Sequence, residues 1–503
     1  MGAMFLGIDC GTQGTKALLV DADGVAHGRG YARHALIEDA SGAREQRPEW
    51  WVQALRQAVK AALAQGASGE QVVGLGVSGQ QHGLVVLDEE GEVIRPAKLW
   101  NDTETAPQNA LLIERLGGPE ACLRRFGILP LTGYTASKLL WLKECEPTSF
   151  ERIRHILLPH EYLNYWLTGK MRAECGDASG TAFFNVRTRQ WARDVLDAID
   201  GGTGQLYAAL PPLMEADGTV GTLRAQVAAD LGIAETCTVS AGGGDNMMGA
   251  IGTGNVREGV VTLSLGTSST VYTYRDCPLD DRIGNVAPFC SSTGGWLPLV
   301  CTMNATNVVT GVLDLLGKTL DEIESALETT APGADGLTML PFVNGERAPD
   351  LPHARGSLSG ISASNMTPAH FIRAAIEGVS FGILNGLDLI CNGVPPDVIL
   401  AIGGGARSLG WRQMLADASG ATVCVPVEEE SGCLGAAIQA MVAHASACGE
   451  QRSFIEVASR CVKLRDEATL KPRPELRALY HAARARYEMR LASTFPELLD
   501  TSR

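Results

Sequence analysis

The sequence predicts an α/β protein built from two large domains. Strand-like apolar stretches alternate with stretches of helical periodicity along most of its 503 residues. One pattern also occurs twice: an apolar strand, a Gly-Thr turn and a second apolar strand, at Gly11-Thr12 and again at Gly266-Thr267. The chain is too long for one hydrophobic core, and a prior of about 150 residues per domain would suggest about three. The spacing of the two hairpins favours two domains instead.

The first domain is predicted to begin with an antiparallel meander. Its strands are "MFLGIDCG", "TKALLVD" and "VAHGRGYARHAL", with turns at Gly11-Thr12 and Asp23-Gly24. A helix is expected from Pro48, because proline suits the first position of a helix. "VVGLGVSG" is then a buried strand and "GLVVLDEEGEVI" a hairpin, and residues 105–235 form a mostly helical insertion. "TVSAGGGDN" closes the domain as a strand that ends in a glycine-rich turn.

The second domain is predicted to restart at "GVVTLSLGTSST", beyond a boundary near residues 250–258. It continues through the helix "PAHFIRAAIEGVSFGILNGLDLI", the strand "DVILAIGG", a helix from Trp411 and the strand "TVCVPV". A C-terminal amphipathic helix, "PELRALYHAARARYEMRLAST", is expected on the surface. The expected domains are therefore residues 1–252 and 253–503.

Composition excludes several classes of protein. Hydrophobic residues make up 45% and charged residues 20%, which is typical of a globular protein. The net charge of −15 disfavours nucleic acid and anionic membrane surfaces as partners. The 13 cysteines form no C-x-x-C pair and no Cys/His cluster at zinc spacing, so we expect reduced thiols in the cytoplasm. We expect neither a signal peptide nor a membrane span, because the apolar runs are short and interrupted by charge.

The two Gly-Thr hairpins predict a clamp on a polyphosphate. A Gly-Thr tip presents backbone N–H groups and a hydroxyl without a side-chain barrier. Asp9 stands two residues before the first tip, where the second has Ser264. A carboxylate beside phosphates needs a cation, and Mg²⁺ takes few protein carboxylates because it keeps waters and phosphate oxygens. We therefore expect Asp9 to anchor Mg²⁺, directly or through water, and Lys16 to add positive charge.

Asp245 is the expected general base. It follows three glycines, in "GGGDN", at the end of a predicted strand. In phosphoryl transfer to an alcohol the protein positions the groups and neutralises charge, and a carboxylate accepts the hydroxyl proton. The structural alternative for an aspartate after glycines is a turn or a helix N-cap.

Nine motifs stand in the order found in FGGY-type carbohydrate kinases, and the chain resembles this family over nearly its whole length. They are "IDCGTQGTK", "GQQHG", "LWND", "GYTASKLLW", "AGGGDN", "LSLGTSS", "LPFVNGERAP", "GSLSGISASNMTPAHFIRAAIEG" and "IGGGARSLGWRQMLAD". Within the family the pattern is most similar to that of the bacterial xylulokinases. The resemblance implies two ribonuclease-H-like domains of the actin and hexokinase type, facing each other across a cleft. It also implies ATP in that cleft and a ketose bound mainly to the first domain.

The resemblance also implies roles for individual residues. Asp245 matches the catalytic base, Gln81 and His82 match the pair that touches the sugar, and Asn246 sits beside the base. The positions that match nucleotide, phosphate or metal sites are Asp9, Gly11, Thr12, Lys16, Gly266, Thr267, Gly404, Gly405 and Ser408. Each has a structural alternative as well: His82 as an ordinary partly buried histidine, Gly404 as a tight turn, and Ser408 as a helix N-cap.

The function expected from these observations is Mg²⁺- and ATP-dependent phosphorylation of a small ketose, with D-xylulose giving D-xylulose 5-phosphate. A kinase for ribulose, glycerol or another polyol is the alternative, and Gln81, His82 and Glu104 would decide between them. Glu104 stands where many relatives carry arginine, and Ser408 where others have asparagine. A non-catalytic actin-like nucleotide-binding module is a third option, which the placement of Asp245 disfavours. The oligomeric state stays open, with a homodimer as one option.

Overall fold

The computed structural model describes residues 2–65, 68–281 and 283–499. The chain forms two compact units, each assembled from three segments. Unit 1 comprises Met1–Arg257, Tyr274–Leu297 and Glu430–Val462, and unit 2 comprises Glu258–Thr273, Pro298–Glu429 and Lys463–Arg503. The division into residues 1–252 and 253–503 stays a prediction for the sequence domains. The compact units do not follow this division of the sequence, because two segments from the second half of the chain, Tyr274–Leu297 and Glu430–Val462, belong to unit 1.

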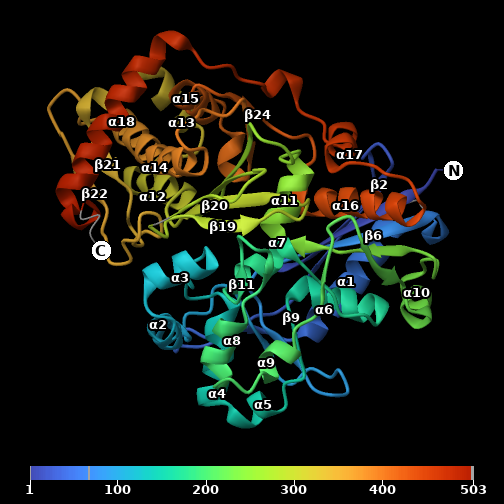
Figure 1. Ribbon diagram of the computed structural model, residues 1–503. Helices are drawn as coiled ribbons and strands as arrows, with labels where there is room; N and C mark the ends of the chain where they lie inside the picture. Colours follow the sequence, from blue (N-terminus) through green and yellow to red (C-terminus); the bar gives the residue numbers. More distant parts are fainter. Residues whose placement is uncertain (1, 66–67, 282, 500–503) are drawn as a thin grey trace. The chain divides into compact units, whose positions relative to one another are not determined.

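The elements of unit 1 are labelled as in Figure 1. Its strands are β1 (Met4–Cys10), β2 (Gly14–Asp21), β3 (Ala26–Arg33), β4 (Ile37–Glu38), β5 (Arg44–Gln46), β6 (Val72–Gly79), β7 (Val85–Leu87), β8 (Ala97–Lys98), β9 (His155–Leu157), β10 (Ala173–Glu174), β11 (Phe184–Asn185), β12 (Gln190–Trp191), β13 (Leu213–Met214), β14 (Thr219–Thr222), β15 (Thr238–Ser240), β16 (Gly243–Gly244) and β19 (Ala287–Cys290). Its helices are α1 (Pro48–Leu63), α2 (Ala106–Arg115), α3 (Pro119–Phe126), α4 (Thr135–Cys145), α5 (Pro147–Glu151), α6 (Pro159–Thr168), α7 (Cys175–Ala178), α8 (Arg193–Asp200), α9 (Gln205–Ala208), α10 (Ala225–Leu231), α11 (Asp245–Thr253), α16 (Ser431–Ala447) and α17 (Phe454–Cys461).

Unit 2 is smaller. Its strands are β17 (Val260–Leu265), β18 (Ser269–Thr273), β21 (Thr338–Leu340), β22 (Ser357–Ser359), β23 (Val398–Ile402), β24 (Thr422–Cys424) and the part of β20 (Trp296–Thr302) from Pro298 onward. Its helices are α12 (Thr306–Leu316), α13 (Glu322–Thr329), α14 (Pro368–Ile390), α15 (Leu409–Ser419) and α18 (Pro474–Thr494).

The two units repeat one sheet topology. In unit 1 the strand order is β3-β2-β1-β6-β15: β1, β2 and β3 pair antiparallel, and β6 and β15 run parallel to β1. In unit 2 the order is β20-β18-β17-β23-β24, with the same pattern of antiparallel and parallel pairs. The Gly-Thr turns join the first two strands in both sheets. The predicted pair of related α/β domains is therefore confirmed.

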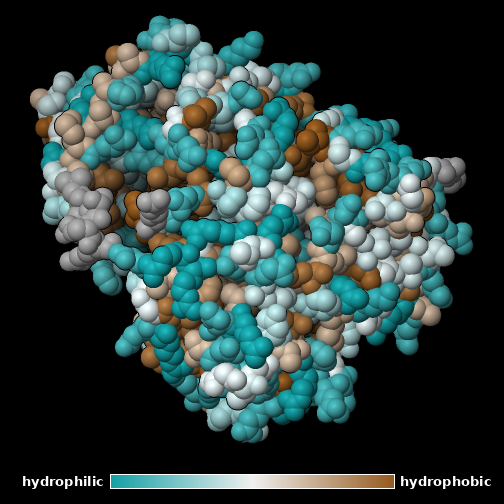
Figure 2. All heavy atoms as spheres, in the orientation of Figure 1, coloured by the Kyte–Doolittle hydropathy of each residue, from teal (hydrophilic) through white to brown (hydrophobic). Residues whose placement is uncertain are grey.

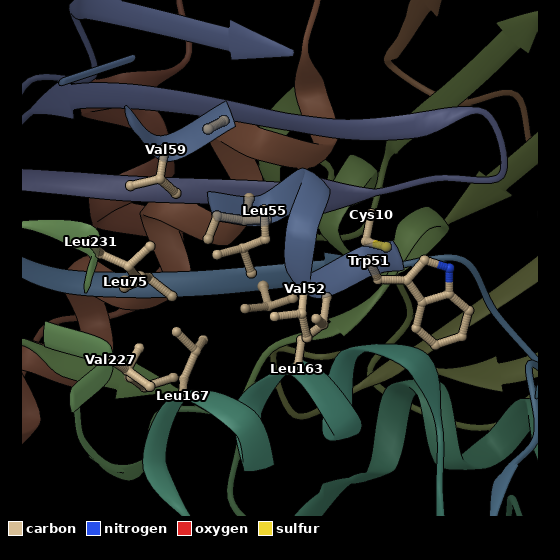
Figure 3. Close-up of a cluster of buried hydrophobic side chains, with 14 of the residues drawn as sticks. Cys10, Trp51, Val52, Leu55, Val59, Leu75, Leu163, Leu167, Val227 and Leu231 are labelled. Atoms are coloured by element: carbon tan, nitrogen blue, oxygen red, sulfur yellow. The ribbon is translucent and has the colours of Figure 1, made fainter. Parts of the chain in front are cut away.

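Helices cover both faces of the unit 1 sheet. Helices α1, α6 and α10 pack on one face, whereas α16 packs on β1 and β6 from the other (Figure 1). Alternate residues of β1 point to opposite faces, as in any strand. Figure 3 shows the core that results on the α1 face. Its labelled side chains are Cys10, Trp51, Val52, Leu55, Val59, Leu75, Leu163, Leu167, Val227 and Leu231.

Glycines allow α16 to approach its neighbours closely. A Cβ added to Gly7 of β1 would lie 1.7 Å from the Cys433 carbonyl oxygen of α16. On the other side of α16, a Cβ on Gly435 would lie 1.8 Å from the Met248 carbonyl oxygen of α11. Helix α16 therefore lies between the sheet and α11 at a separation that side chains would prevent. This packing fixes α11, whose first residue is Asp245.

Gly435→Ala is expected to destabilise unit 1, because the new methyl group would overlap the Met248 carbonyl, which belongs to helix backbone. Overpacking of this kind typically costs about 1–3 kcal/mol of the free energy of unfolding. Urea unfolding followed by circular dichroism should show a lower midpoint. Gly311→Ala in α12 is the matched control, since nothing lies within 4 Å of its added Cβ. An equal loss of stability in both variants would contradict the close-packing account.

Several predicted elements differ from those observed. The hairpin expected over residues 83–94 is present but short, with one bridge between Leu87 and Val93, and β7 also pairs with β9. The helix expected from Trp411 begins at Leu409. Helix α16 was not predicted.

The described helices include none that is both long enough and apolar enough to cross a membrane. The face shown in Figure 2 is mostly hydrophilic, and its hydrophobic residues lie in small separate areas.

Candidate functional site

The predicted site residues of the first half of the chain gather where parallel strands of unit 1 end. Asp9 of β1 is in register with Ser78 of β6, and Ser78 is in register with Gly243 of β16. The chain continues from these three strands into Gly11-Thr12, Gln80–His82 and Asp245. Carboxyl ends of parallel strands meet at one edge of a sheet, which is where ligands bind in open α/β sheets. The topology thus brings together residues far apart in sequence.

Asp245 is a half-buried carboxylate at the first position of α11. Its Oδ1 accepts hydrogen bonds from the Asn246 N–H at 2.8 Å and the Asn246 side-chain amide at 3.1 Å. Its Oδ2 accepts none within the described chain. The N-cap is Gly244, so the predicted alternative of an N-cap aspartate is not what the structure contains. The second carboxylate oxygen is available to a ligand.

Burial raises the pKa of Asp245 to about 7. The negative charges of Asp9 and Asp177 raise it further, and the hydrogen bonds from Asn246 act in the opposite direction. A carboxylate whose pKa lies near neutral pH suits a general base, because it is basic enough to take a proton and still ionised at working pH.

Gln81 lies close to Asp245, and His82 follows Gln81 in the chain. The Asn246 amide donates to the Gln81 Oε1 at 2.9 Å, so a chain of hydrogen bonds joins Asp245, Asn246 and Gln81. The Gln81 Nε2 is buried and has no hydrogen-bond acceptor among the residues that the structure describes. The His82 ring stacks on Tyr134, with centroids 4.4 Å apart, and packs near Phe289 at 5.8 Å. A buried amide donor and an aromatic surface thus adjoin the proposed base.

The first hairpin tip offers backbone donors but not its hydroxyl hydrogen. The Gly11 N–H closes the turn on the Gly14 carbonyl at 3.1 Å. The Thr12 hydroxyl donates to the Gln80 Oε1 at 3.0 Å and accepts from the Trp100 indole N–H at 3.0 Å. The N–H groups of Thr12 and Gln13 have no acceptor within the described part of the chain. The two backbone amides are therefore free for phosphate oxygens, as expected, whereas the hydroxyl hydrogen is already donated to Gln80.

Asp9 has one oxygen bound and one free. Its Oδ1 accepts from the Ser78 hydroxyl at 2.7 Å, while Oδ2 has no hydrogen bond in the described residues. Burial raises the pKa of Asp9, and the Ser78 hydrogen bond and the Lys16 charge act against that rise. One hard oxygen ligand fits Mg²⁺, which fills its remaining positions with water and phosphate. The donor set therefore fits the expected metal.

Lys16 is paired within unit 1. Its Nζ lies 2.5 Å from the Glu430 Oε2, and 42% of its side chain is exposed. Burial lowers the pKa of Lys16, but the hydrogen bond and charge of Glu430 outweigh this and leave it raised. The positive charge expected near the phosphates is thus largely balanced by Glu430.

Glu104 belongs to an ion network. Among the described residues, Glu45, Asp102 and Glu104 are the one group of three or more carboxylate, histidine or cysteine side chains whose ligand atoms lie within 4.8 Å of one another. The Lys98 Nζ contacts all three, at 3.1, 3.2 and 2.5 Å. The Lys98 ammonium and the Arg95 guanidinium, which lies 2.7 Å from Glu45, offset two of the three carboxylate charges, and Glu104 is engaged in this network.

The predicted nucleotide residues of unit 2 gather around the second hairpin. The Gly266 N–H bonds to the Ser268 carbonyl at 3.1 Å, and the N–H groups of Thr267 and Ser268 have no acceptor in the described chain. Gly403 adopts a φ of +87°, and a Cβ there would lie 2.7 Å from the Leu265 carbonyl oxygen. The glycine turn that includes Gly404 and Gly405 therefore lies against the strand that leads into the tip.

Ser408 acts as a helix N-cap. Its hydroxyl accepts from the Trp411 N–H at 3.1 Å and donates to the Glu324 Oε1 at 2.7 Å. Glu324 also accepts from the Gly410 N–H at 2.7 Å. The structural alternative for Ser408 is therefore what the structure contains, and its role toward adenosine stays a prediction.

The sequence reasoning missed several side chains that contact predicted site residues, among them Ser78, Gln80, Trp100 and Tyr134. Gln80, Trp100 and Tyr134 stand inside the motifs "GQQHG", "LWND" and "GYTASKLLW", which were the available signal. Ser78 is a small polar residue in a buried strand, and nothing in the local pattern distinguishes it.

Known proteins match this chain over most of its length. Models of the N-terminal and C-terminal domains of the FGGY family of carbohydrate kinases match residues 4–252 and 261–444. The xylulose kinase of Haemophilus influenzae is 48% identical over 448 residues, 88% of this chain and 91% of that protein. The crystal structure of xylulose kinase from Bifidobacterium adolescentis is 30% identical and superposes with a TM-score of 0.84, covering 97% of this chain and 99% of that one. The chain therefore belongs to the FGGY family of carbohydrate kinases.

Proposed function

We propose that this protein transfers the γ-phosphate of ATP to D-xylulose and forms D-xylulose 5-phosphate. The observation that carries the proposal is Asp245, a half-buried carboxylate with a free oxygen, joined through Asn246 to the sugar-side residue Gln81. The choice of sugar rests on the similarity to xylulose kinases, 48% identity in the case of Haemophilus influenzae.

Asp245 carries the chemical step. Its free oxygen accepts the proton of the terminal hydroxyl as that oxygen attacks the γ-phosphorus. The new O–P bond forms while the bond from phosphorus to the β-bridging oxygen breaks, and ADP leaves. The buried Nε2 of Gln81 donates to a sugar oxygen, and the amides of Thr12 and Gln13 donate to phosphate oxygens. Asp9 would hold Mg²⁺, which when bound neutralises the charge that develops on the phosphates.

A sugar panel tests the proposal. Purified protein with ATP and Mg²⁺ is assayed for ADP release with D-xylulose, D-ribulose, L-ribulose and glycerol, and the product is identified by ³¹P NMR. We expect the highest kcat/KM with D-xylulose, by about tenfold or more. A higher value with another polyol would replace the proposed substrate. If none of the four compounds gives ADP release, the actin-like binding module is favoured.

The kcat/KM for the ketose is expected to rise with pH through an apparent pKa near the value of about 7 for Asp245. Below that pH the carboxylate is protonated and cannot accept the hydroxyl proton, so activity falls about tenfold per pH unit. Asp177→Asn should move this limb to lower pH, because the charge of Asp177 raises the pKa of Asp245. A pH profile that is flat from pH 5.5 to 8 (about the span titrated by such a group) would contradict the assignment.

Location and assembly extend the proposal. No disulfide joins the cysteines of the described residues, and thiols stay reduced in reducing compartments, which supports a cytoplasmic enzyme. The homodimer stays a prediction, and size-exclusion chromatography with light scattering measures it.

A further inference from the structure

Lys138 is a buried ammonium group without a carboxylate partner. It lies in α4 with a fully buried side chain, and within the described part of the chain its Nζ bonds to backbone carbonyls and to no carboxylate. Burial lowers the pKa of Lys138 to about 7; the charge of Asp102 raises it and that of Lys98 lowers it further. An apolar side chain of similar volume would avoid this desolvation, so the ammonium needs a compensating role.

The Nζ of Lys138 joins two turns. It donates to the carbonyl of His82 at 2.6 Å and to the carbonyl of Gly133 at 2.7 Å. His82 follows Gln81 directly, and Gly133 precedes Tyr134, whose ring stacks on His82. One ammonium group therefore ties together the two segments that present Gln81, His82 and Tyr134.

The backbone of His82 requires this support. Its φ is +65°, in the left-handed region that a residue with a Cβ rarely adopts. A second donor from the same helix, the Thr135 hydroxyl, also bonds to the His82 carbonyl, at 3.2 Å. Two side chains of helix α4, those of Lys138 and Thr135, thus donate to the carbonyl of a residue with strained backbone.

We propose that Lys138 is a positioning residue for sugar binding, holding the His82 and Gly133 carbonyls so that Gln81 stays bonded to Asn246 and the His82 ring stays stacked on Tyr134. The inference rests on the proposed function, in which Gln81 and His82 contact the ketose. Because Lys138 bonds to backbone and not to substrate, its loss acts on the binding of the ketose and leaves the binding of ATP unchanged.

Lys138→Met keeps most of the side-chain length and removes the donors. We expect the KM for D-xylulose to rise about 10- to 100-fold, as for the loss of hydrogen bonds from a charged group. The KM for ATP should stay within about threefold of wild type. Lys143→Met is the matched control, because Lys143 lies on the same helix and also donates to a backbone carbonyl, that of Ile199 at 2.6 Å. Its KM for D-xylulose should not change.

Thr135→Val supplies a second, independent test. It removes the other donor to the His82 carbonyl and should raise the KM for D-xylulose by a smaller factor. In the double variant, the increase in KM for D-xylulose should differ from the product of the increases in the two single variants, because both donors act on one carbonyl. If Lys138→Met does not fold, as judged by circular dichroism, Thr135→Val decides: an unchanged ketose KM overturns the proposal.

The outcomes separate the two proposals. A wild-type protein that phosphorylates D-xylulose, with an unchanged ketose KM in Lys138→Met, overturns the role of Lys138 alone. Equal increases in Lys138→Met and Lys143→Met also overturn it, since they would indicate a general effect on the helix. A wild-type protein that phosphorylates none of the sugars overturns the proposed function.

Discussion

Asp245→Asn is expected to lower turnover by about 10²- to 10⁴-fold and to leave binding of the ketose nearly unchanged. In the wild-type protein the Asn246 N–H donates to the Asp245 Oδ1 at 2.8 Å. Asparagine keeps an oxygen that can accept this hydrogen bond, so the local hydrogen bonds persist. It cannot accept the hydroxyl proton. Turnover is measured by coupled ADP release at saturating D-xylulose and ATP, and ketose binding by calorimetry.

A buried aspartate elsewhere in unit 1 provides the comparison for Asp245→Asn. Asp200 caps a turn by accepting from the Gly202 N–H at 2.8 Å, and its hydrogen-bond partners in the described chain include none of the site residues. Asp200→Asn should therefore change stability and not turnover. Turnover of Asp245→Asn within about threefold of wild type would remove Asp245 from its assigned role.

Asp9→Ala is expected to raise the Mg²⁺ concentration needed for half-maximal turnover by about tenfold or more and to depress the maximum. The substitution removes the free Oδ2 that we assign to the metal, whereas Ser264→Ala at the equivalent position of the second hairpin removes no carboxylate. Ser264→Ala should therefore change little. Titration of turnover with Mg²⁺, at saturating ATP and ketose, measures both.

Gly432→Ala gives an intermediate test of the same carboxylate. A Cβ at this position would lie 3.0 Å from the Asp9 Cγ, so the carboxylate must shift by a few tenths of an ångström. The Mg²⁺ requirement should rise, but by less than in Asp9→Ala. Equal effects from Asp9→Ala and Ser264→Ala would show that the metal assignment is wrong.

The repeated framework could be predicted from sequence because its signals are local. Strands β1 and β2 are apolar stretches on either side of a Gly-Thr turn, and so are β17 and β18. This local pattern was enough to predict both hairpins. Helix α14 was predicted with its observed bounds, Pro368–Ile390, since proline marks its start and its apolar residues follow helical spacing.

The position of Asp245 after three glycines also pointed to the site from sequence alone. A glycine-rich strand end leaves its next side chain accessible, and this requires no information from distant residues. The structure agrees: Asp245 follows β16 directly and begins α11.

Helix α16 could not be predicted from its own residues. It is buried between the sheet and α11, so it is apolar or small on nearly every side and shows no amphipathic pattern. Its membership of unit 1 depends on the close approach of Gly7 and Gly435 to neighbouring backbone, which only the packed chain reveals.

The two-domain α/β framework, the two hairpin tips and the place of Asp245 could be predicted from the amino-acid sequence, because turns, periodicity and strand ends are encoded within a few residues. How the side chains at those places are used depends on contacts between segments far apart in the chain. Lys16 pairs with Glu430, which lies 414 residues away, and the Thr12 hydroxyl bonds to Gln80. A hydrogen bond forms with whichever donor or acceptor the packed elements bring within reach, and spacing along the chain does not specify that partner.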